Sequence, residues 1–203
     1  SADQTPELFD AARIGLGALG VITRITLECV PAFNLHERAW SLDFEDALRQ
    51  MPELVERHDH LKYWWLPYTG QMQVYAADRT EELATKRRLV DRIDESGLLR
   101  PVFAAVLRLE ANHTKLIPAL NHLIDATYLA DRDHVAASHR VFKVPMPPAH
   151  LESEYAVELP DAPDVLRELR ALIEWERLPA NFVNEIRFVG ADEGELFVAG
   201  ELL

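Results

Sequence analysis

Hydrophobic and polar positions along the chain follow two periods, one typical of strands and one typical of helices. Alternation with β-branched or aromatic residues predicts strands, because successive side chains of a strand point to opposite faces. A spacing of three or four residues between apolar positions predicts amphipathic helices. The pattern predicts strands at 21–27, 34–42, 60–66, 71–77, 138–144, 152–159, 182–189 and 196–199, and helices at 5–12, 44–55, most of 81–130 and 162–178.

The order of these elements predicts the fold class. Only Tyr68-Thr69-Gly70 separates two of the strands, which is typical of an antiparallel hairpin. Strands come in pairs with helices between the pairs, whereas a parallel sheet needs strict alternation of strand and helix. We therefore expect an α+β protein with a mainly antiparallel sheet and helices packed on one side. Asp43 is expected to cap the helix after it, and 103–109, apolar on nearly every side, is expected to be buried.

Three glycines, Gly15, Gly17 and Gly20, spell the string G-x-G-x-x-G. In a dinucleotide-binding fold this string follows a strand and opens a helix. Here the predicted helix precedes the loop and the predicted strand follows it, so the order excludes a Rossmann site. Two interpretations of the loop remain, either a helix end with a tight turn or a loop whose backbone closely approaches a ligand.

The charge balance and the apolar runs exclude some partners. The chain has 34 acidic and 21 basic residues, a net charge of −13 and no long basic run. Nucleic acid and anionic membrane surfaces are therefore not expected partners. No apolar run approaches the roughly 20 residues of a membrane span, and no signal peptide opens the chain, so we expect a cytoplasmic location.

The main candidate for chemistry is a pair of opposite charges in the predicted strand 182–189. Because side chains alternate, Glu185 and Arg187 share one face, and Ile186 and Phe188 lie on the other. The two charges form either a solvated salt bridge or part of a polar pocket for a hydroxylated ligand. The eight histidines and the single cysteine have no metal-ligand spacing, so no metal site is expected. No G-x-S-x-G string supports a hydrolase.

Four segments, in order along nearly the whole chain, resemble one enzyme family. They are PELFDAARIGLGALGVIT at 6–23, the pattern His-x-x-Tyr-Trp-Trp-Leu-Pro at 60–67, Glu-x-Glu-Tyr-Ala-Val at 152–157 and NEIRFVGAD at 184–192. Together they are similar to sugar-1,4-lactone oxidases, the group that includes arabinonolactone, gulonolactone and alditol oxidases within the vanillyl-alcohol-oxidase superfamily. The chain resembles the last piece of the flavin domain, residues 1–32, and most of the cap or substrate domain, residues 33–203.

The resemblance implies a flavoenzyme that transfers a hydride from a CH–OH group of a sugar lactone, alditol or related small sugar to FAD. Glu185 and Arg187 would face the isoalloxazine and the substrate hydroxyls. The carboxylate would orient a hydroxyl, and the guanidinium would stabilise developing negative charge. The glycine loop and the start of the next strand would touch FAD mainly through backbone, at Gly15, Leu16, Gly17, Gly20, Val21 and Ile22.

The resemblance also implies that this sequence lacks parts of the family's enzymes. The amino-terminal half of the flavin domain and a carboxy-terminal segment with a His-Trp-Gly-Lys-type lysine are absent, so we expect a fragment whose partner is the remainder of the flavin domain. After Asp192 the family continues with a Leu-Ser-containing stretch, where this chain has Leu196-Phe197-Val198. Two alternatives stay open. One is a non-redox α+β module that binds a ligand or partner, and the other is a flavin dehydrogenase of a cell-wall or lipid-linked sugar with an acceptor other than oxygen.

Overall fold

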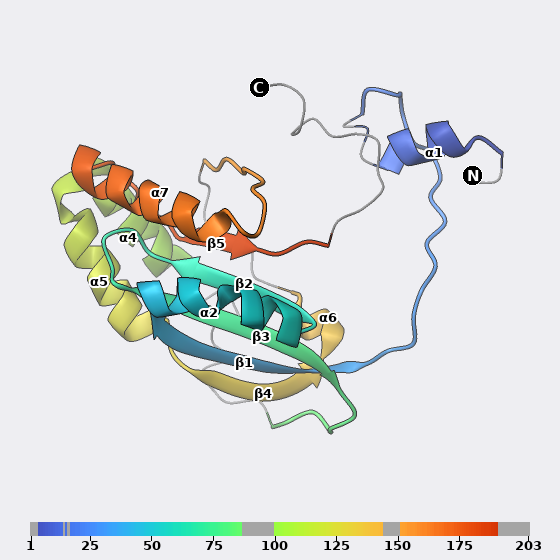
Figure 1. Ribbon diagram of the computed structural model, residues 1–203, viewed down its shortest axis with the longest axis horizontal. Coiled ribbons are helices and arrows are strands. Elements are labelled where there is room, and N and C mark those ends of the chain that lie inside the picture. Colours follow the sequence, from blue (N-terminus) through green and yellow to red (C-terminus); the bar gives the residue numbers. More distant parts are fainter. Residues whose placement is uncertain (1–3, 14, 16, 87–99, 144–150, 191–203) are drawn as a thin grey trace. The chain divides into compact units, whose positions relative to one another are not determined.

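The computed structural model describes residues 4–13, 15, 17–86, 100–143 and 151–190. The chain divides into two units, one formed by residues 1–31 with 189–203 and the other by residues 32–188. The smaller unit contains α1 (Pro6–Arg13), at the position of the first expected helix. The larger unit contains the sheet and the other described helices (Figure 1).

An antiparallel sheet forms the centre of the larger unit. Its strands are β1 (Asn34–Asp43), β2 (His60–Trp65), β3 (Gln71–Thr80), β4 (Arg132–Ala137) and β5 (Asn184–Arg187). Their order is β4-β1-β3-β2-β5, and every neighbouring pair is antiparallel. The expected hairpin is present, since β2 and β3 pair with each other. The predicted α+β class with an antiparallel sheet is therefore confirmed.

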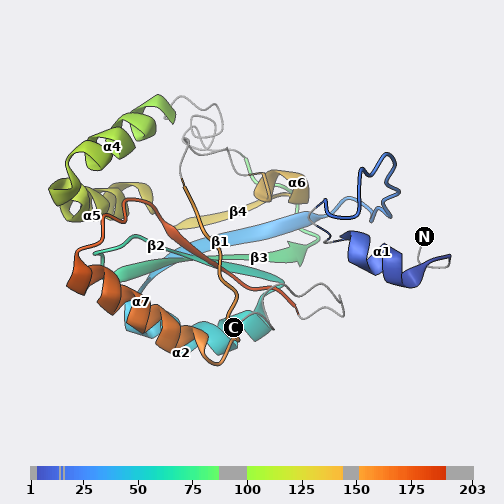
Figure 2. The same ribbon diagram turned by 90° about the horizontal axis from the view of Figure 1, so that it is seen from above.

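Helices lie beside both faces of this sheet. The described ones are α2 (Phe44–Arg57), α4 (Arg100–Asn112), the 3-10 helix η1 (Thr114–Leu116), α5 (Ile117–Tyr128), α6 (Ser138–Val141) and α7 (Ala162–Glu176). Helices α2 and α7 share one face, while α4 and α5 lie toward the other side (Figure 2), so the expectation that the helices pack on one side only is wrong. The Asn121 side chain of α5 donates to Pro67 O at 3.0 Å, which ties α5 to the β2–β3 turn. None of the described helices has the length and apolar composition needed to cross a membrane.

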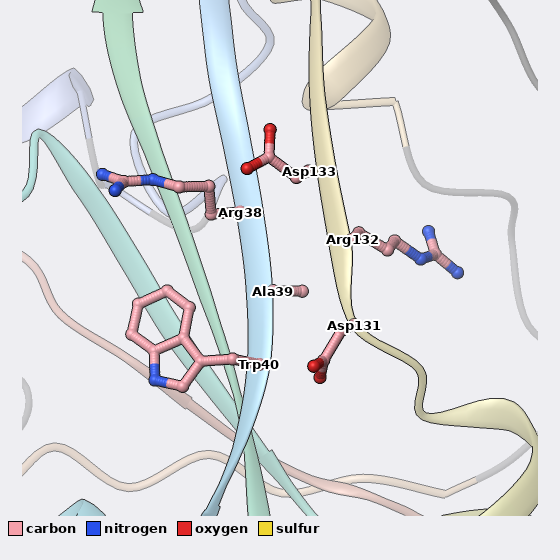
Figure 3. A pocket seen from close by; sticks show the side chains of 6 residues that line it. All are labelled: Arg38, Ala39, Trp40, Asp131, Arg132 and Asp133. Atoms are coloured by element: carbon pink, nitrogen blue, oxygen red, sulfur yellow. The ribbon is translucent and has the colours of Figure 1, made fainter.

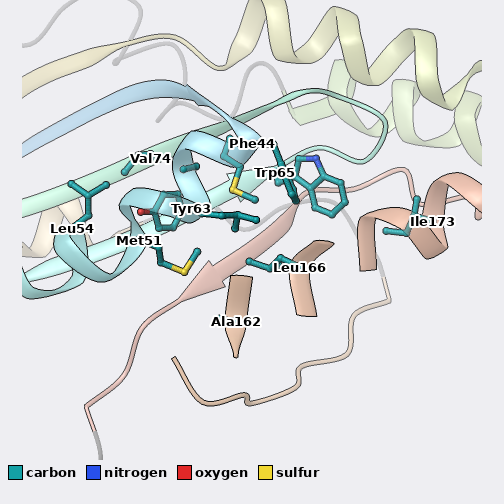
Figure 4. Packing of buried hydrophobic residues seen from close by; sticks show 12 residues of the cluster. Phe44, Met51, Leu54, Tyr63, Trp65, Val74, Ala162, Leu166 and Ile173 are labelled. Atoms are coloured by element: carbon teal, nitrogen blue, oxygen red, sulfur yellow. The ribbon is translucent and has the colours of Figure 1, made fainter. Parts of the chain in front are cut away.

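The hydrophobic core lies between the sheet and the helices α2 and α7 (Figure 4). Phe44 of α2 meets Trp65 of β2 edge-on at a centroid distance of 5.2 Å, and both side chains are buried. Ala162, Leu166 and Ile173 contribute the buried positions of α7. Each fully buried large apolar side chain adds roughly 1.5–3 kcal/mol to stability. This packing fixes which face of the sheet points inward, and therefore which face is left for polar groups.

Side chains at both ends of α2 fix the helix on the sheet. At its start, the Asp43 carboxylate accepts a hydrogen bond from Glu45 N at 3.0 Å, which confirms the expected cap. At its end, His58 Nδ1 lies 2.9 Å from Asp78 Oδ2 of β3, and Arg38 of β1 donates to the same oxygen at 3.0 Å. Burial alone would raise the pKa of Asp78, but the hydrogen bonds that it accepts lower this pKa below its ordinary value.

Three predicted strands are wrong. Residues 21–27 and 152–158 form no regular secondary structure and are exposed. The predicted strand 138–144 begins with the helix α6 instead, because the ladder between β1 and β4 ends at the pair Asn34–Ala137. Strand propensity produces a strand only where a neighbouring backbone supplies hydrogen bonds, and the sequence pattern does not show that neighbour.

Two other expectations concern the edges of the described region. The predicted strand 196–199 lies outside the described residues. The segment 103–109 is not buried on all sides, since Leu109 is 42% exposed. Helix α4 uses one side for packing, where Phe103 meets Phe182 at a ring distance of 5.9 Å, and its opposite side remains accessible.

Candidate functional site

The predicted site strand is β5, and its side chains alternate as expected. Glu185 and Arg187 are exposed on one face, while Ile186 between them packs against the core. In the pairing of β5 with β2, Glu185 lies opposite Trp64 and Arg187 opposite Lys62. The sheet therefore places two charged residues of β5 beside two residues of β2, on the face that α2 and α7 do not cover.

The two charged residues of β5 have separate ionic partners. Lys62 Nζ lies 3.3 Å from Glu185 Oε1. Arg187 Nη2 donates to Glu154 Oε1 at 2.5 Å, which holds the segment before α7 against the outer edge of β5. Glu185 and Arg187 thus share a face without forming the single salt bridge that one interpretation expected. Exposed pairs of this kind contribute about 1 kcal/mol or less, so their main effect is orientation.

Carboxylates surround the guanidinium of Arg187. The hydrogen bond and charge of Glu154, followed by the charges of Glu185 and Glu152, raise the pKa of Arg187 above its ordinary value. The side chain is 58% exposed. A guanidinium has five N–H donors, of which this ion pair uses only part. Arg187 is therefore a fixed cation with donors left to meet negative charge on a ligand.

Aromatic and amide side chains continue this face of the sheet. On β3, Tyr75 lies opposite Lys62, and Gln73 lies opposite Trp64. The Trp64 and Tyr75 rings meet edge-on at 4.9 Å. The Gln73 amide oxygen accepts a hydrogen bond from Ser41 Oγ at 2.6 Å. The polar face of the sheet is defined as Ser41, Lys62, Trp64, Gln73, Tyr75, Glu185 and Arg187. Gln73 and Tyr75 are buried, and Gln73 also donates to Ala130 O, so the groups left for a hydroxylated ligand are the exposed charges on β5.

Sequence reasoning found Glu185 and Arg187 but not their partners. Lys62 stands two residues before Trp64, so the alternation of β2 put it on the same face as Trp64. Its contact with Glu185 depends on the pairing of β2 with β5, which lies 123 positions away in the sequence. Glu154 belongs to the motif at 152–157 that carried the resemblance, although the predicted strand there is wrong. The motif drew attention to Glu154, but the sequence did not show that Glu154 pairs with Arg187.

The glycine loop belongs to the smaller unit. Gly15 O accepts from Ala18 N at 2.8 Å and Gly17 O accepts from Gly20 N at 3.3 Å, so two turns follow α1. Gly17 and Gly20 have φ angles of +79° and +107°, which side chains rarely allow. A Cβ atom at Gly15 would lie 2.7 Å from Ala11 O. Conformation and packing both require glycine here, and the tight turns of one interpretation are present.

The same loop leaves its backbone accessible to a ligand. Apart from the glycines themselves and their chain neighbours, no atom of the described residues lies within 4 Å of the Cβ positions at Gly17 and Gly20. Val21 and Ile22 follow, with 91% and 59% of their surfaces exposed, and Leu16 lies outside the described residues. A flat and partly apolar group that is contacted through backbone fits these residues. The two interpretations of the loop are therefore compatible with each other.

A shallow hollow of about 420 Å³ lies elsewhere on the sheet, between β1 and β4 (Figure 3). It contains no residue of the polar face. Arg132 points away from the side of the sheet on which Arg38 and Trp40 lie, so the charged groups do not converge on one point. The hollow is therefore a weaker candidate than the polar face. Its lining consists of Arg38, Ala39, Trp40, Asp131, Arg132 and Asp133.

Known proteins resemble this chain over nearly all of its length. The sequence profile of the D-arabinono-1,4-lactone oxidase family matches residues 25–201. The L-gulono-1,4-lactone dehydrogenase of Mycobacterium tuberculosis is 27% identical over 193 residues, 93% of this chain and 44% of that protein. The L-gulonolactone oxidase of Scyliorhinus torazame is 25% identical over 189 residues, 92% of this chain and 42% of that protein. The D-arabinono-1,4-lactone oxidase of Eremothecium gossypii is 34% identical over 87 residues, 43% of this chain and 16% of that protein.

These comparisons agree with the resemblance drawn from the four motifs. The relatives are named as oxidases and dehydrogenases of sugar lactones, that is, as oxidoreductases. The chain spans less than half the length of these relatives. The family match begins after the glycine loop and includes both β2 and β5, the strands that carry the charged groups. The chain belongs to the D-arabinono-1,4-lactone oxidase family.

Proposed function

We propose that this chain is the substrate-facing part of a FAD-dependent oxidoreductase that oxidises a CH–OH group of a sugar lactone, alditol or related small sugar. Family membership supports the reaction class. The observation that carries the proposal is the position of Glu185 and Arg187, both exposed on one face of β5 and each held by its own ion pair. An acceptor and a fork-shaped donor about 7 Å apart at i and i+2 suit a polyhydroxylated substrate.

Each of the two residues has a distinct role in this proposal. The Glu185 carboxylate accepts the hydrogen bond of a substrate hydroxyl and so orients the carbinol carbon. The Arg187 guanidinium donates to the substrate oxygen as negative charge develops on it. FAD, when bound, supplies the chemistry of hydride acceptance. No metal is required for these roles, because a permanent cation already lies at the site.

The proposed contacts to FAD are made by the glycine loop. Its members Gly17 and Gly20 combine positive φ angles with open space where a side chain would be. Exposed apolar side chains at Val21 and Ile22 follow directly. These features support a contact made mainly through backbone, by Gly15, Leu16, Gly17, Gly20, Val21 and Ile22.

The proposal divides the chain into residues 1–32, which belong to the flavin domain, and residues 33–203, which belong to the substrate domain. The remainder of the flavin domain is then the main protein partner, and the small sugar is the second partner. The relatives' length supports this division, since each is more than twice as long as the matched segment. The activity proposed here therefore belongs to the full-length protein.

Replacement of Arg187 tests the proposal. In the full-length flavoprotein, Arg187→Ala should lower turnover of L-gulono-1,4-lactone or D-arabinono-1,4-lactone by about tenfold to a thousandfold, since a donor to developing charge is lost. Arg187→Lys keeps the charge but not the fork and should give an intermediate value. Steady-state kinetics with the flavin content of each variant measured in parallel would show this. Unchanged turnover in Arg187→Ala would contradict the proposal and favour a binding module.

The electron acceptor needs its own measurement, because the relatives include both oxidases and dehydrogenases. An oxygen electrode records oxygen consumption with each lactone, and a dye acceptor under nitrogen records turnover that does not depend on oxygen. Oxygen consumption at the rate of dye reduction would identify an oxidase. Dye reduction without oxygen consumption would identify a dehydrogenase.

A further inference from the structure

Lys62 of β2 is the lysine that the strand pairing places beside Glu185 and Arg187 of β5. The pairing of β2 places it opposite Arg187 on one side and opposite Tyr75 on the other. Its Nζ atom nevertheless points to Glu185, with a distance of 3.3 Å to Oε1. The Lys62 side chain thus reaches diagonally across the two strands, from its own position opposite Arg187 to Glu185, which lies opposite Trp64.

Aromatic rings hold the Lys62 ammonium in this position. Nζ lies 4.7 Å from the ring centroid of Trp64 and 5.2 Å from that of Tyr75. Both distances are within the range of a cation–π contact. The side chain of Lys62 is 27% exposed and that of Glu185 is 38% exposed, so the ion pair is partly shielded from water. A lysine side chain usually moves among many rotamers, and here three groups restrict it.

Arg187 does not perform the same task for Glu185. Its guanidinium is bonded to Glu154, at 2.5 Å, on the outer side of β5. The charges of the site are therefore sorted into two pairs, Lys62 with Glu185 and Arg187 with Glu154. This sorting keeps the Glu185 carboxylate as an acceptor with a fixed direction and keeps Arg187 free to turn part of its donors toward a ligand.

We propose that Lys62, held over Trp64 and Tyr75, is the positioning residue for the Glu185 carboxylate. This inference rests on the proposed function, in which Glu185 orients a substrate hydroxyl. Lys62 acts through Glu185 and has no contact of its own with the reacting atoms. A misplacement of about 1 Å in a group that orients substrate costs up to about a hundredfold in rate.

A double-mutant cycle in the full-length flavoprotein tests this inference. The probe is whichever of L-gulono-1,4-lactone and D-arabinono-1,4-lactone is turned over faster. Lys62→Met, which keeps the length and apolar stem, should lower kcat/KM about tenfold to a hundredfold. Lys62→Arg should recover most of that loss, because the cation remains. In an enzyme that already carries Glu185→Gln, adding Lys62→Met should change kcat/KM by less than about twofold.

A purely structural role for Lys62 predicts different results. With such a role the two substitutions act independently, so their fold reductions in kcat/KM multiply in the double variant. That outcome overturns the inference. The inference is also overturned if Glu185→Gln alone impairs the enzyme while Lys62→Met alone leaves it fully active. If Glu185→Gln itself is fully active, the proposed function of Glu185 fails instead, and the two failures are distinguishable. Lys115→Met changes an exposed lysine of η1 and serves as the matched control.

Discussion

The carboxyl group of Glu110 is a buried titratable group outside the candidate site. Its residue is completely buried near the end of α4, and neither side-chain oxygen makes a full hydrogen bond. Burial raises the pKa of Glu110 from 4.5 to about 7, although the nearby Asn181 side chain acts to lower it. A group that binds its proton more tightly in the folded state makes stability fall as pH rises.

Glu110 should therefore make stability depend on pH between about 4.5 and 7. Below this window the carboxyl is neutral in both states, and above it the folded protein bears the cost of a buried charge. Glu110→Gln should raise the urea midpoint relative to wild type more at about pH 8 than at about pH 5. Glu168→Gln, an exposed change on α7, is the matched control and should shift both midpoints equally. Equal shifts in Glu110→Gln would contradict the prediction.

Individual residues show what the sequence alone could and could not predict about the site. Glu185 and Arg187 were identified because strand alternation puts i and i+2 on one face. Lys62 was not, because its contact with Glu185 depends on which two strands pair. Local spacing determines the face on which a side chain lies. Cross-strand partners depend on long-range pairing, which one sequence does not reveal.

At the scale of elements, helices and strands differ in how far they can be predicted from local sequence. Helices were predicted well because caps and periodicity are local, as Asp43 and α2 show. The strands β1, β2 and β3 were predicted, whereas β4 was missed although it pairs with β1. The segments 21–27 and 152–158 have strand-like composition but no ladder in the described part of the chain. Helix signals are local, whereas strand formation needs a partner.

Removal of the α2 cap tests the local part of this rule. Asp43→Ala deletes the hydrogen bond from Glu45 N and should cost about 1 kcal/mol of stability. Asp161 precedes α7 at the same cap position, but its side chain makes no cap bond. Asp161→Ala should therefore cost clearly less. Urea unfolding of both variants would measure the difference, and equal costs would show that the Asp43 bond adds nothing.

At the scale of the whole molecule, the order of the strands in the sheet could not be predicted from the sequence. β1 lies between β3 and β4, and it pairs with β4 across a separation of about a hundred residues, as the pair Asn34–Ala137 shows. Hydrophobic alternation is the same for any neighbour, so it cannot select one order among several. The α+β class followed from the order of elements, but the arrangement that brings β5 beside β2 did not.

The proposed division into a flavin part and a substrate part predicts how the 203-residue chain behaves alone. In this chain only the glycine loop and the pair Glu185 and Arg187 would lie against FAD, and together they supply a small share of the contacts that a large cofactor needs. The purified chain should therefore carry no stoichiometric FAD and show no turnover. Visible absorbance of the protein peak in size-exclusion chromatography measures this, with the full-length protein as the control. A yellow peak with one flavin per chain would contradict the prediction.

The alternation of β2 and β5 has a consequence for how such a protein can change over generations. Neighbouring positions in these strands serve different purposes. Tyr63, Trp65 and Ile186 pack in the core and maintain the fold. Lys62, Trp64 and Glu185 lie on the polar face. In a library of all single substitutions, scored once for abundance and once for turnover, sensitivity should switch from one score to the other at every step along each strand. Substrate preference can then drift on one face without loss of the core, whereas a single inserted residue would exchange the two faces at once.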